Sequence, residues 1–188
     1  KMGTHNHLMR LGEQLFLEVI AINPEGVQPE QPRWFGLDEP LQRASLSRQP
    51  RLLTWVANTR DIHTTQRNSD FDFGRITAIS RGELNWLFGV PDDGRILAGG
   101  MLPYLMQWQT DTHPAGNMHD AGCHLESLDL YHANTGWLAD ILASIGLLEK
   151  IKLHPLPENQ AAFLCATIAT PTGSRQLYSQ SAEPLIKK

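Results

Sequence analysis

A single carboxylate in an apolar stretch is the first place in this chain where residue types suggest chemistry. Glu18 lies in residues 15–22, LFLEVIAI, and its neighbours there are all apolar. This pattern predicts a β-strand that is covered on both faces. A carboxylate in such a strand is costly unless it is paired, protonated or bound to a metal. Glu18 therefore needs a partner and is a candidate catalytic residue.

The segment before Glu18 offers several partners. Residues 5–11 predict a first strand, and residues 12–14, GEQ, predict the turn of a hairpin. Because side chains alternate along a strand, this first strand has two faces, one with His5 and His7 and the other with Asn6 and Arg10.

Two interpretations of Glu18 remain open. Two histidines on one face can bind one metal ion, here together with Glu18, although an exposed strand start also explains His5 and His7. Alternatively, Arg10 forms a cross-strand ion pair with Glu18. As neighbours of this carboxylate, His5, Asn6 and Arg10 are also candidate ligand-binding residues.

Large aromatic residues suggest a pocket for an aromatic or acyl group. Trp34 and Phe35 lie in a predicted loop, where they either close a pocket or pin the loop to the core. Trp55, Trp86 and Trp108 fall in three predicted strands. They line either a pocket or the core between sheet and helices.

Two polar residues outside the hairpin complete the candidates that chemistry alone suggests. Arg81 follows Ser80 at a predicted strand end, where it either anchors a ligand carboxylate or is solvated. His113 precedes Pro114 in a loop and is either a catalytic acid or base or a residue that packs the loop.

Composition limits the class of protein. The chain has 188 residues, 41% of them hydrophobic, which is enough for a packed core, and a formal net charge of -4, which argues against nucleic-acid binding. It has no apolar run long enough for a membrane span. Its two cysteines, Cys123 and Cys165, predict neither a disulfide framework nor a zinc cluster, so we expect a cytoplasmic protein.

The predicted elements form an α+β chain in which one unit recurs. After a Pro-rich loop at 23–32 and a short helix at 39–47, a strand, a helix and three strands follow, and the same order then occurs again. In the first unit the strand is 51–58, expected to be a central strand, the helix is 61–67, and the three further strands are 73–80, 83–90 and 102–109. In the second unit the strand is 123–132, the helix begins at 134 or 135 and ends at Gly146, and the three further strands are 149–153, 162–169 and 175–180. We expect residues 181–188 to be a frayed tail.

Several short motifs in this order resemble the glyoxalase-like proteins of the vicinal-oxygen-chelate superfamily. They are Gly3-Thr4-His5-Asn6, Phe16-Leu17-Glu18-Val19-Ile20-Ala21, Pro32-Arg33-Trp34-Phe35-Gly36-Leu37, Leu53-Thr54-Trp55-Val56-Ala57, Ile79-Ser80-Arg81, Leu84-Asn85-Trp86, Leu102-Pro103-Tyr104-Leu105-Met106-Gln107-Trp108, His113-Pro114 and Gly122-Cys123.

The resemblance implies a single domain, 1–188, built from βαβββ modules that form cupped, partly open mixed β-sheet barrels. Residues 1–50 would be a truncated first module that lacks its first strand and helix, and residues 51–120 and 121–180 the second and third modules. Superfamily enzymes hold a divalent ion such as Zn, Fe, Mn or Ni through histidines and carboxylates inside the barrel. Glu18 stands where the first module often carries its carboxylate.

This chain departs from the family pattern at other ligand positions. Thr54-Trp55-Val56 stands where relatives have a histidine, and Gln107 precedes Trp108 where relatives have an acidic residue. Gln107 is therefore a candidate for ligand binding only.

Three functional hypotheses follow. The first is a lyase, isomerase or dioxygenase whose chemistry is assisted by a divalent metal at Glu18. The second is a metal-free protein that binds or sequesters a small molecule in a tryptophan-lined cup. The third is a homodimer in which another chain completes the truncated module.

Overall fold

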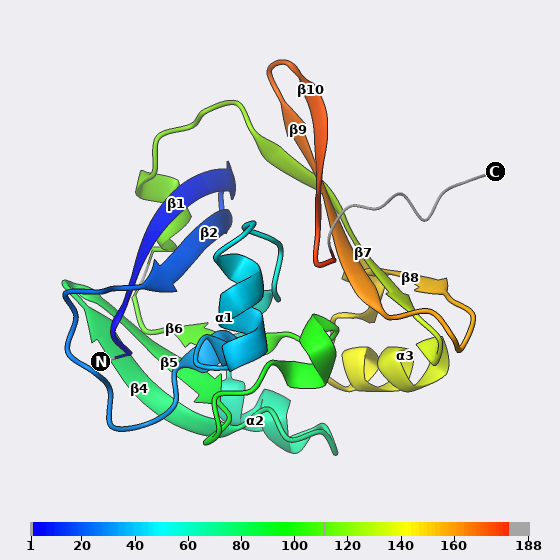
Figure 1. Cartoon of the computed structure of the whole chain (residues 1–188), viewed down its shortest axis with the longest axis horizontal. Coiled ribbons are helices and arrows are strands. Elements are labelled where there is room, and N and C mark those ends of the chain that lie inside the picture. Colours follow the sequence, from blue (N-terminus) through cyan, green and yellow to red (C-terminus); the bar gives the residue numbers. More distant parts are fainter. Residues whose placement is uncertain (1, 111, 181–188) are drawn as a thin grey trace.

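The computed structural model describes residues 2–110 and 112–180. This part of the chain contains three separate β-sheets with few helices between them (Figure 1). The predicted α+β class is confirmed, and the three sheets do not close into a barrel within the described residues.

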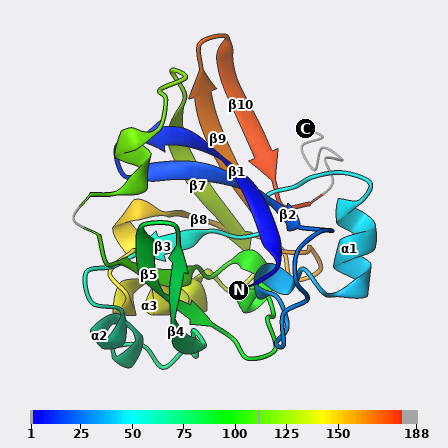
Figure 2. The same ribbon diagram turned by 90° about the vertical axis from the view of Figure 1, so that its left-hand side faces the viewer.

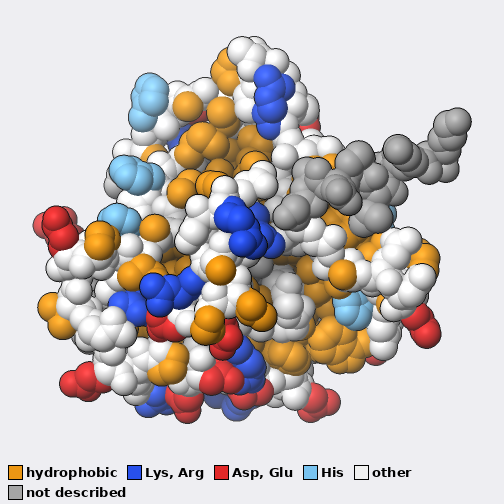
Figure 3. All heavy atoms as spheres, viewed as in Figure 1, with side chains coloured by type: hydrophobic (Ala, Val, Ile, Leu, Met, Phe, Trp, Pro, Cys, Tyr) orange, Lys and Arg blue, Asp and Glu red, His pale blue; other side chains and the backbone are white. Residues whose placement is uncertain are grey.

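The first sheet is the predicted hairpin, formed by β1 (Thr4–Gly12) and β2 (Leu15–Ile22). Ile20 and Ile22 face the body of the protein and pack against its core, whereas Val19 on the other face is 58% exposed. The expectation that this strand is covered on both faces is therefore wrong, because no further layer of the described chain lies over the outer face of the ribbon. Figure 3 shows hydrophobic side chains gathered between this hairpin and the strands β9 (Phe163–Thr170) and β10 (Gly173–Tyr178).

A loop connects the hairpin to the second sheet and is fixed by a partly buried ion pair. Arg33 is 4% exposed, and its Nη1 lies 2.6 Å from Oδ1 of Asp38. The loop contains the 3-10 helix η1 (Trp34–Gly36) and is followed by α1 (Pro40–Leu46), close to the predicted helix.

The second, central sheet has the strand order β3-β6-β5-β4, with β3 parallel to β6 and the other pairs antiparallel. The helix α2 begins after Asp61, whose carboxylate accepts a hydrogen bond from the backbone N–H of Thr64 at 3.0 Å. The elements are β3 (Val56–Asn58), α2 (Ile62–Arg67), β4 (Arg75–Arg81), β5 (Leu84–Val90), the 3-10 helix η2 (Leu97–Gly100) and β6 (Tyr104–Trp108).

The prediction of a central strand at 51–58 is wrong. Only Val56–Asn58 is a strand, and it lies at the edge of the sheet. The preceding residues pass between two sheets instead of joining one. The N–H of Leu52 donates to the carbonyl of Tyr178 in the third sheet, while the carbonyl of Trp55 accepts from Tyr104 in the central sheet.

The third, C-terminal sheet has the strand order β10-β9-β7-β8. This unit has the same order of elements as the central unit, but its strands pair differently. Its first strand, β7, lies between β8 and β9, whereas the first strand of the central unit, β3, lies beside β6, the last strand of that unit. The division of the chain into three modules stays a prediction. The elements are the 3-10 helix η3 (Pro114–Asn117), which precedes the sheet, β7 (His124–His132), α3 (Thr135–Ser144), the 3-10 helix η4 (Leu148–Lys150), β8 (Lys152–Pro155), β9 (Phe163–Thr170) and β10 (Gly173–Tyr178).

Most of the remaining predicted elements are confirmed to within two residues. The strand expected from 149 begins only at Lys152, because Leu148–Lys150 forms a 3-10 turn. The tail at 181–188, predicted to be frayed, lies outside the described residues.

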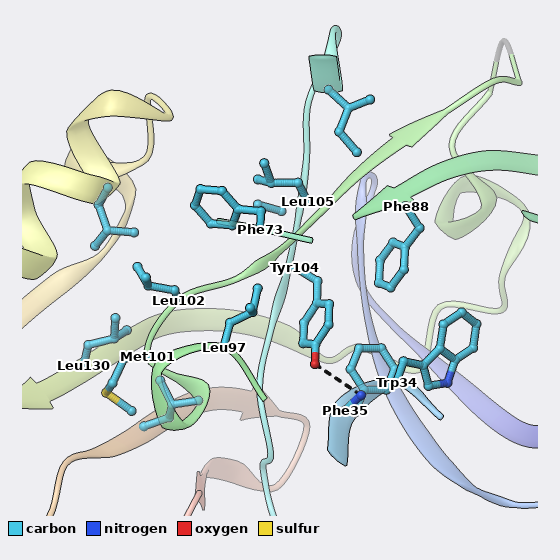
Figure 4. Packing of buried hydrophobic residues seen from close by; sticks show 14 of the residues in the cluster. Trp34, Phe35, Phe73, Phe88, Leu97, Met101, Leu102, Tyr104, Leu105 and Leu130 are labelled. Atoms are coloured by element: carbon cyan, nitrogen blue, oxygen red, sulfur yellow. Dashed lines mark hydrogen bonds between the residues drawn. The ribbon is translucent and has the colours of Figure 1, made fainter. Parts of the chain in front are cut away.

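One hydrophobic core joins the central and C-terminal sheets (Figure 4). Tyr104 is fully buried in it, and its hydroxyl donates to the carbonyl of Arg95 at 2.6 Å and accepts from the N–H of Phe35 at 3.2 Å. Burial raises the pKa of Tyr104 far above its usual value. This hydroxyl therefore stays neutral and links the Trp34 loop to the sheet.

Replacement of Tyr104 by Phe should destabilise the fold. The variant leaves the N–H of Phe35 and the carbonyl of Arg95 without their partner, at a cost of about 1–3 kcal/mol in the free energy of unfolding. Urea denaturation measures this cost. Tyr178→Phe is the control, because the Tyr178 hydroxyl reaches the exposed side chain of Gln176. Equal effects of the two substitutions would contradict the role assigned to Tyr104.

Candidate functional site

The candidate site lies between the hairpin and one face of the central sheet (Figures 1 and 2). Strand register places Trp86 directly opposite Trp108 and beside Ile79. Their side chains share a face of the sheet with Phe88, because alternate residues of a strand point the same way. The hairpin lies over this face.

A row of rings connects the sheet to the hairpin. The Trp86 and Trp108 ring centroids are 5.3 Å apart, and the Trp108 ring lies 5.8 Å from the imidazole of His113. The imidazole in turn lies 5.8 Å from the ring of Phe16 in β2. Trp86 is buried, whereas the other three rings are partly exposed, so the accessible surface of the row is that of Trp108, His113 and Phe16.

The position and protonation of His113 follow from its loop. Its Nδ1 accepts the N–H of Ala115 at 3.2 Å, at the start of the 3-10 helix η3. Partial burial lowers the pKa of His113 below its ordinary value. The imidazole is therefore neutral near pH 7 and carries its proton on Nε2, where it can donate to a ligand oxygen.

A polar chain runs beside the rings from the sheet to the hairpin. The side-chain amide of Asn6 donates to Oε1 of Glu18 at 2.5 Å, and its carbonyl oxygen accepts from Nη1 of Arg81 at 2.8 Å. One amide thus satisfies a carboxylate on one side and a guanidinium on the other. Arg81 is also diagonal to Trp86, because its own partner in β5 is Leu84.

The expected ion pair between Glu18 and Arg10 is not formed within the described residues. Leu8 is the residue opposite Glu18, so Asn6 and Arg10 are both its diagonal neighbours. Asn6 is the neighbour that reaches the carboxylate, and Arg10 lies opposite Phe16.

Glu18, His5 and His7 do not fit one shared metal site in this arrangement. His5 pairs with Ala21 and His7 with Val19, so both imidazoles project from the outer face of the hairpin, while Glu18 projects from the inner face. No three or more histidine, cysteine, aspartate or glutamate side chains gather closely enough for a metal ion anywhere in residues 2–110 and 112–180. These three residues therefore do not fit a divalent metal ion in this arrangement.

Four other predicted site residues lie apart from the row of rings. Trp34 and Phe35 are each 7% exposed and belong to the core, against Phe88 and Tyr104 (Figure 4). Trp55 donates its indole N–H to the carbonyl of Met101 at 3.3 Å. Gln107 projects from the opposite face of the sheet, where its Oε1 accepts the N–H of Ile62 at the start of α2.

Phe16 is a site residue that the sequence did not identify. Its ring contacts His113, and it lies on the same face of β2 as Glu18. The sequence indicated only that Phe16 and Glu18 share a face, because side chains alternate between the two faces of a strand.

The fold is that of an α+β domain in which a two-stranded hairpin and a mixed β-sheet bring the candidate site together. A family model described as a glyoxalase-like domain matches residues 1–146. The chain therefore belongs to the glyoxalase-like domain family of the vicinal-oxygen-chelate superfamily, a small-molecule-binding fold. The match ends just after α3, so β8, β9 and β10 lie beyond it.

Searches of curated proteins and of solved structures gave no match. In the part of the chain that the structure describes, no helix has the length and apolarity needed to cross a membrane.

Asn6→Asp should reveal the polar chain through a pH-dependent loss of stability. The new carboxylate would face Glu18 instead of donating to it, and two ionised carboxylates in contact repel each other. Above the pKa values of both groups we expect a loss of about 1–2 kcal/mol. The loss should shrink as pH falls through about 4, where carboxylates become protonated.

Urea denaturation of the variant and the wild type, above and below a pH of about 4, tests this expectation. Asn85→Asp is the matched control, because Asn85 is exposed on β5 and its amide reaches only a neighbouring backbone carbonyl, that of Glu83. If the loss of stability in Asn6→Asp did not depend on pH, repulsion between the new carboxylate and Glu18 would not be its cause.

Proposed function

We propose that this protein binds a small organic acid between the hairpin and the central sheet, without a metal. The aromatic or acyl part of the ligand would lie against Trp108, whose ring packs beside the buried Trp86, and its carboxylate would bind Arg81. The observation that carries the proposal is the row of rings from Trp86 to Phe16 with an arginine diagonal to its first member.

Arg81 has the capacity for this contact. Its side chain is exposed, and in the described structure only Nη1 has a hydrogen-bond partner, the carbonyl oxygen of Asn6. The other N–H groups of the guanidinium can bind a carboxylate through two parallel hydrogen bonds. Asn6 holds the guanidinium in place while leaving those groups exposed.

The rings supply the apolar part of the site. Tryptophan offers a large flat surface that stacks on aromatic ligands at low entropic cost. The neutral imidazole of His113 lies against the Trp108 ring and can donate from Nε2 to a ligand oxygen. Together these groups suit a planar acid with a further oxygen.

The alternative function is metal-assisted lyase, isomerase or dioxygenase chemistry at Glu18. The geometry supports it less well, because one oxygen of Glu18 is held by Asn6 and the two candidate histidines project from the other face of the hairpin.

The binding proposal predicts quenching of tryptophan fluorescence by 2-naphthoate in protein stripped of metal. Trp108→Leu should weaken binding about tenfold or more, because it removes the stacking surface. Arg81→Met should weaken binding of 2-naphthoate but not of 2-naphthamide, which has no carboxylate. Trp137→Phe is the control, because Trp137 lies in α3, away from the site.

Two results would contradict this site. One is a 2-naphthoate affinity that Trp108→Leu leaves unchanged. The other is an equal loss of both ligands in Arg81→Met, which would indicate a change of structure instead of a lost carboxylate contact.

Elemental analysis separates the two functions. If binding needs no metal, the purified wild type and Glu18→Gln should both lack a stoichiometric transition metal, and a chelator should not change the 2-naphthoate affinity. About one equivalent of metal in the wild type that is lost in Glu18→Gln would instead support metal-assisted chemistry at the hairpin.

A further inference from the structure

A second group of polar and aromatic residues lies on the C-terminal sheet, apart from the site described above. The helix α3 covers one face of this sheet, where Leu138 and Leu142 share the core with Leu130 and Leu164. Side chains that alternate with Leu130 along β7 therefore occupy the other face. Asp129 and Tyr131 are on that face, as are their neighbours across the strands, Lys152, His154, Phe163 and Cys165.

Asp129 holds His154 by a short hydrogen bond. Oδ1 of Asp129 lies 2.7 Å from Nε2 of His154, and Oδ2 accepts the hydroxyl of Ser127 at 2.5 Å. The Asp129 side chain is 13% exposed, whereas that of His154 is 38% exposed. The carboxylate is thus shielded, and the imidazole it holds is accessible.

This contact fixes which nitrogen of His154 is free. Burial tends to raise the pKa of Asp129, but the hydrogen bonds from Ser127 and His154 outweigh it and hold the pKa below its usual value. The ionised carboxylate accepts the proton on Nε2, so Nδ1 remains as the second polar position of the ring. In the neutral imidazole Nδ1 is then an acceptor, and a hydrogen bond made there would leave the contact with Asp129 intact.

Parallel aromatic rings stand beside the imidazole. The Tyr131 ring stacks on His154 with centroids 4.4 Å apart, and Phe163 stacks on Tyr131 at 4.3 Å, with interplanar angles of 14° and 6°. The three rings come from β8, β7 and β9. They form a cross-strand ladder that ends at β8, the edge strand of this sheet.

We propose that this ladder is a second binding site, and that it takes a phenol or an enol. A ligand of this class has one O–H group for Nδ1 of His154 and a flat apolar body for the ring ladder. The ladder itself is apolar, and burial raises the pKa values of Tyr131 and of the Cys165 thiol beside it, which keeps both groups neutral. The proposal is independent of the organic-acid site on the central sheet.

The test is a titration of the full chain with 4-fluorophenol, followed by fluorine NMR. 4-Fluoroanisole is the matched ligand, since it has the same ring but no O–H to donate. We expect the phenol to bind about tenfold more tightly than the anisole. We also expect His154→Gln to remove this preference, while His124→Gln, at the exposed start of β7, leaves it unchanged.

Asp129→Asn tests the positioning role of the carboxylate. This variant should weaken phenol binding and change the tautomer of His154, which nitrogen NMR of labelled histidine reports directly. Trp108→Leu should leave phenol binding unchanged, because Trp108 belongs to the other site.

Any of three results would overturn the proposal. They are equal affinities for the phenol and the anisole in the wild type, an unchanged preference in His154→Gln, and loss of phenol binding in Trp108→Leu. The first needs no variant, so it decides the question even if a substitution disturbs β8.

Discussion

The side-chain amide of Asn6 is the polar contact that joins the hairpin to the central sheet. A two-stranded ribbon is marginally stable by itself and must be held by tertiary contacts. Ile20 and Ile22 supply apolar packing at one end of this ribbon, and packing alone tolerates sliding. The amide adds direction, because its oxygen must face the guanidinium of Arg81 and its nitrogen the carboxylate of Glu18.

Much of this local structure could be predicted from the sequence. The apolar alternation of residues 15–22 predicted the strand with its observed ends, and Glu18 was the residue whose environment required a partner. The partner could not be predicted, because Asn6 and Arg10 occupy equivalent diagonal positions and only the complete register distinguishes them. Arg81 was predicted as a ligand-binding residue from its place at a strand end. Its hydrogen bond to Asn6 could not be predicted, because the two residues are 75 positions apart and no periodic pattern in the sequence connects them.

The aromatic residues show the same limit. Their types predicted an aromatic surface, but five similar residues divide between different environments. Trp34 and Phe35 pack around Tyr104 in the core, Trp55 bonds to a backbone carbonyl, and only Trp86 and Trp108 form the row that reaches His113. Trp55 lies outside this row because residues 51–55 cross from the third sheet to the second. They do not form the central strand that their β-propensity predicted.

The two units with a shared element order differ in what their sheets can bind, and the cause is strand pairing. In the central unit the last strand returns beside the first, so Tyr104 and Trp108 of β6 project towards the hairpin and the Trp34 loop. In the C-terminal unit β8 follows α3 directly and pairs in parallel with β7, as in a βαβ crossover. That pairing brings His154 beside Tyr131 and within reach of Asp129. Element order alone would have assigned His154 a different neighbour, so the acid–base pair is a consequence of topology that strand prediction does not contain.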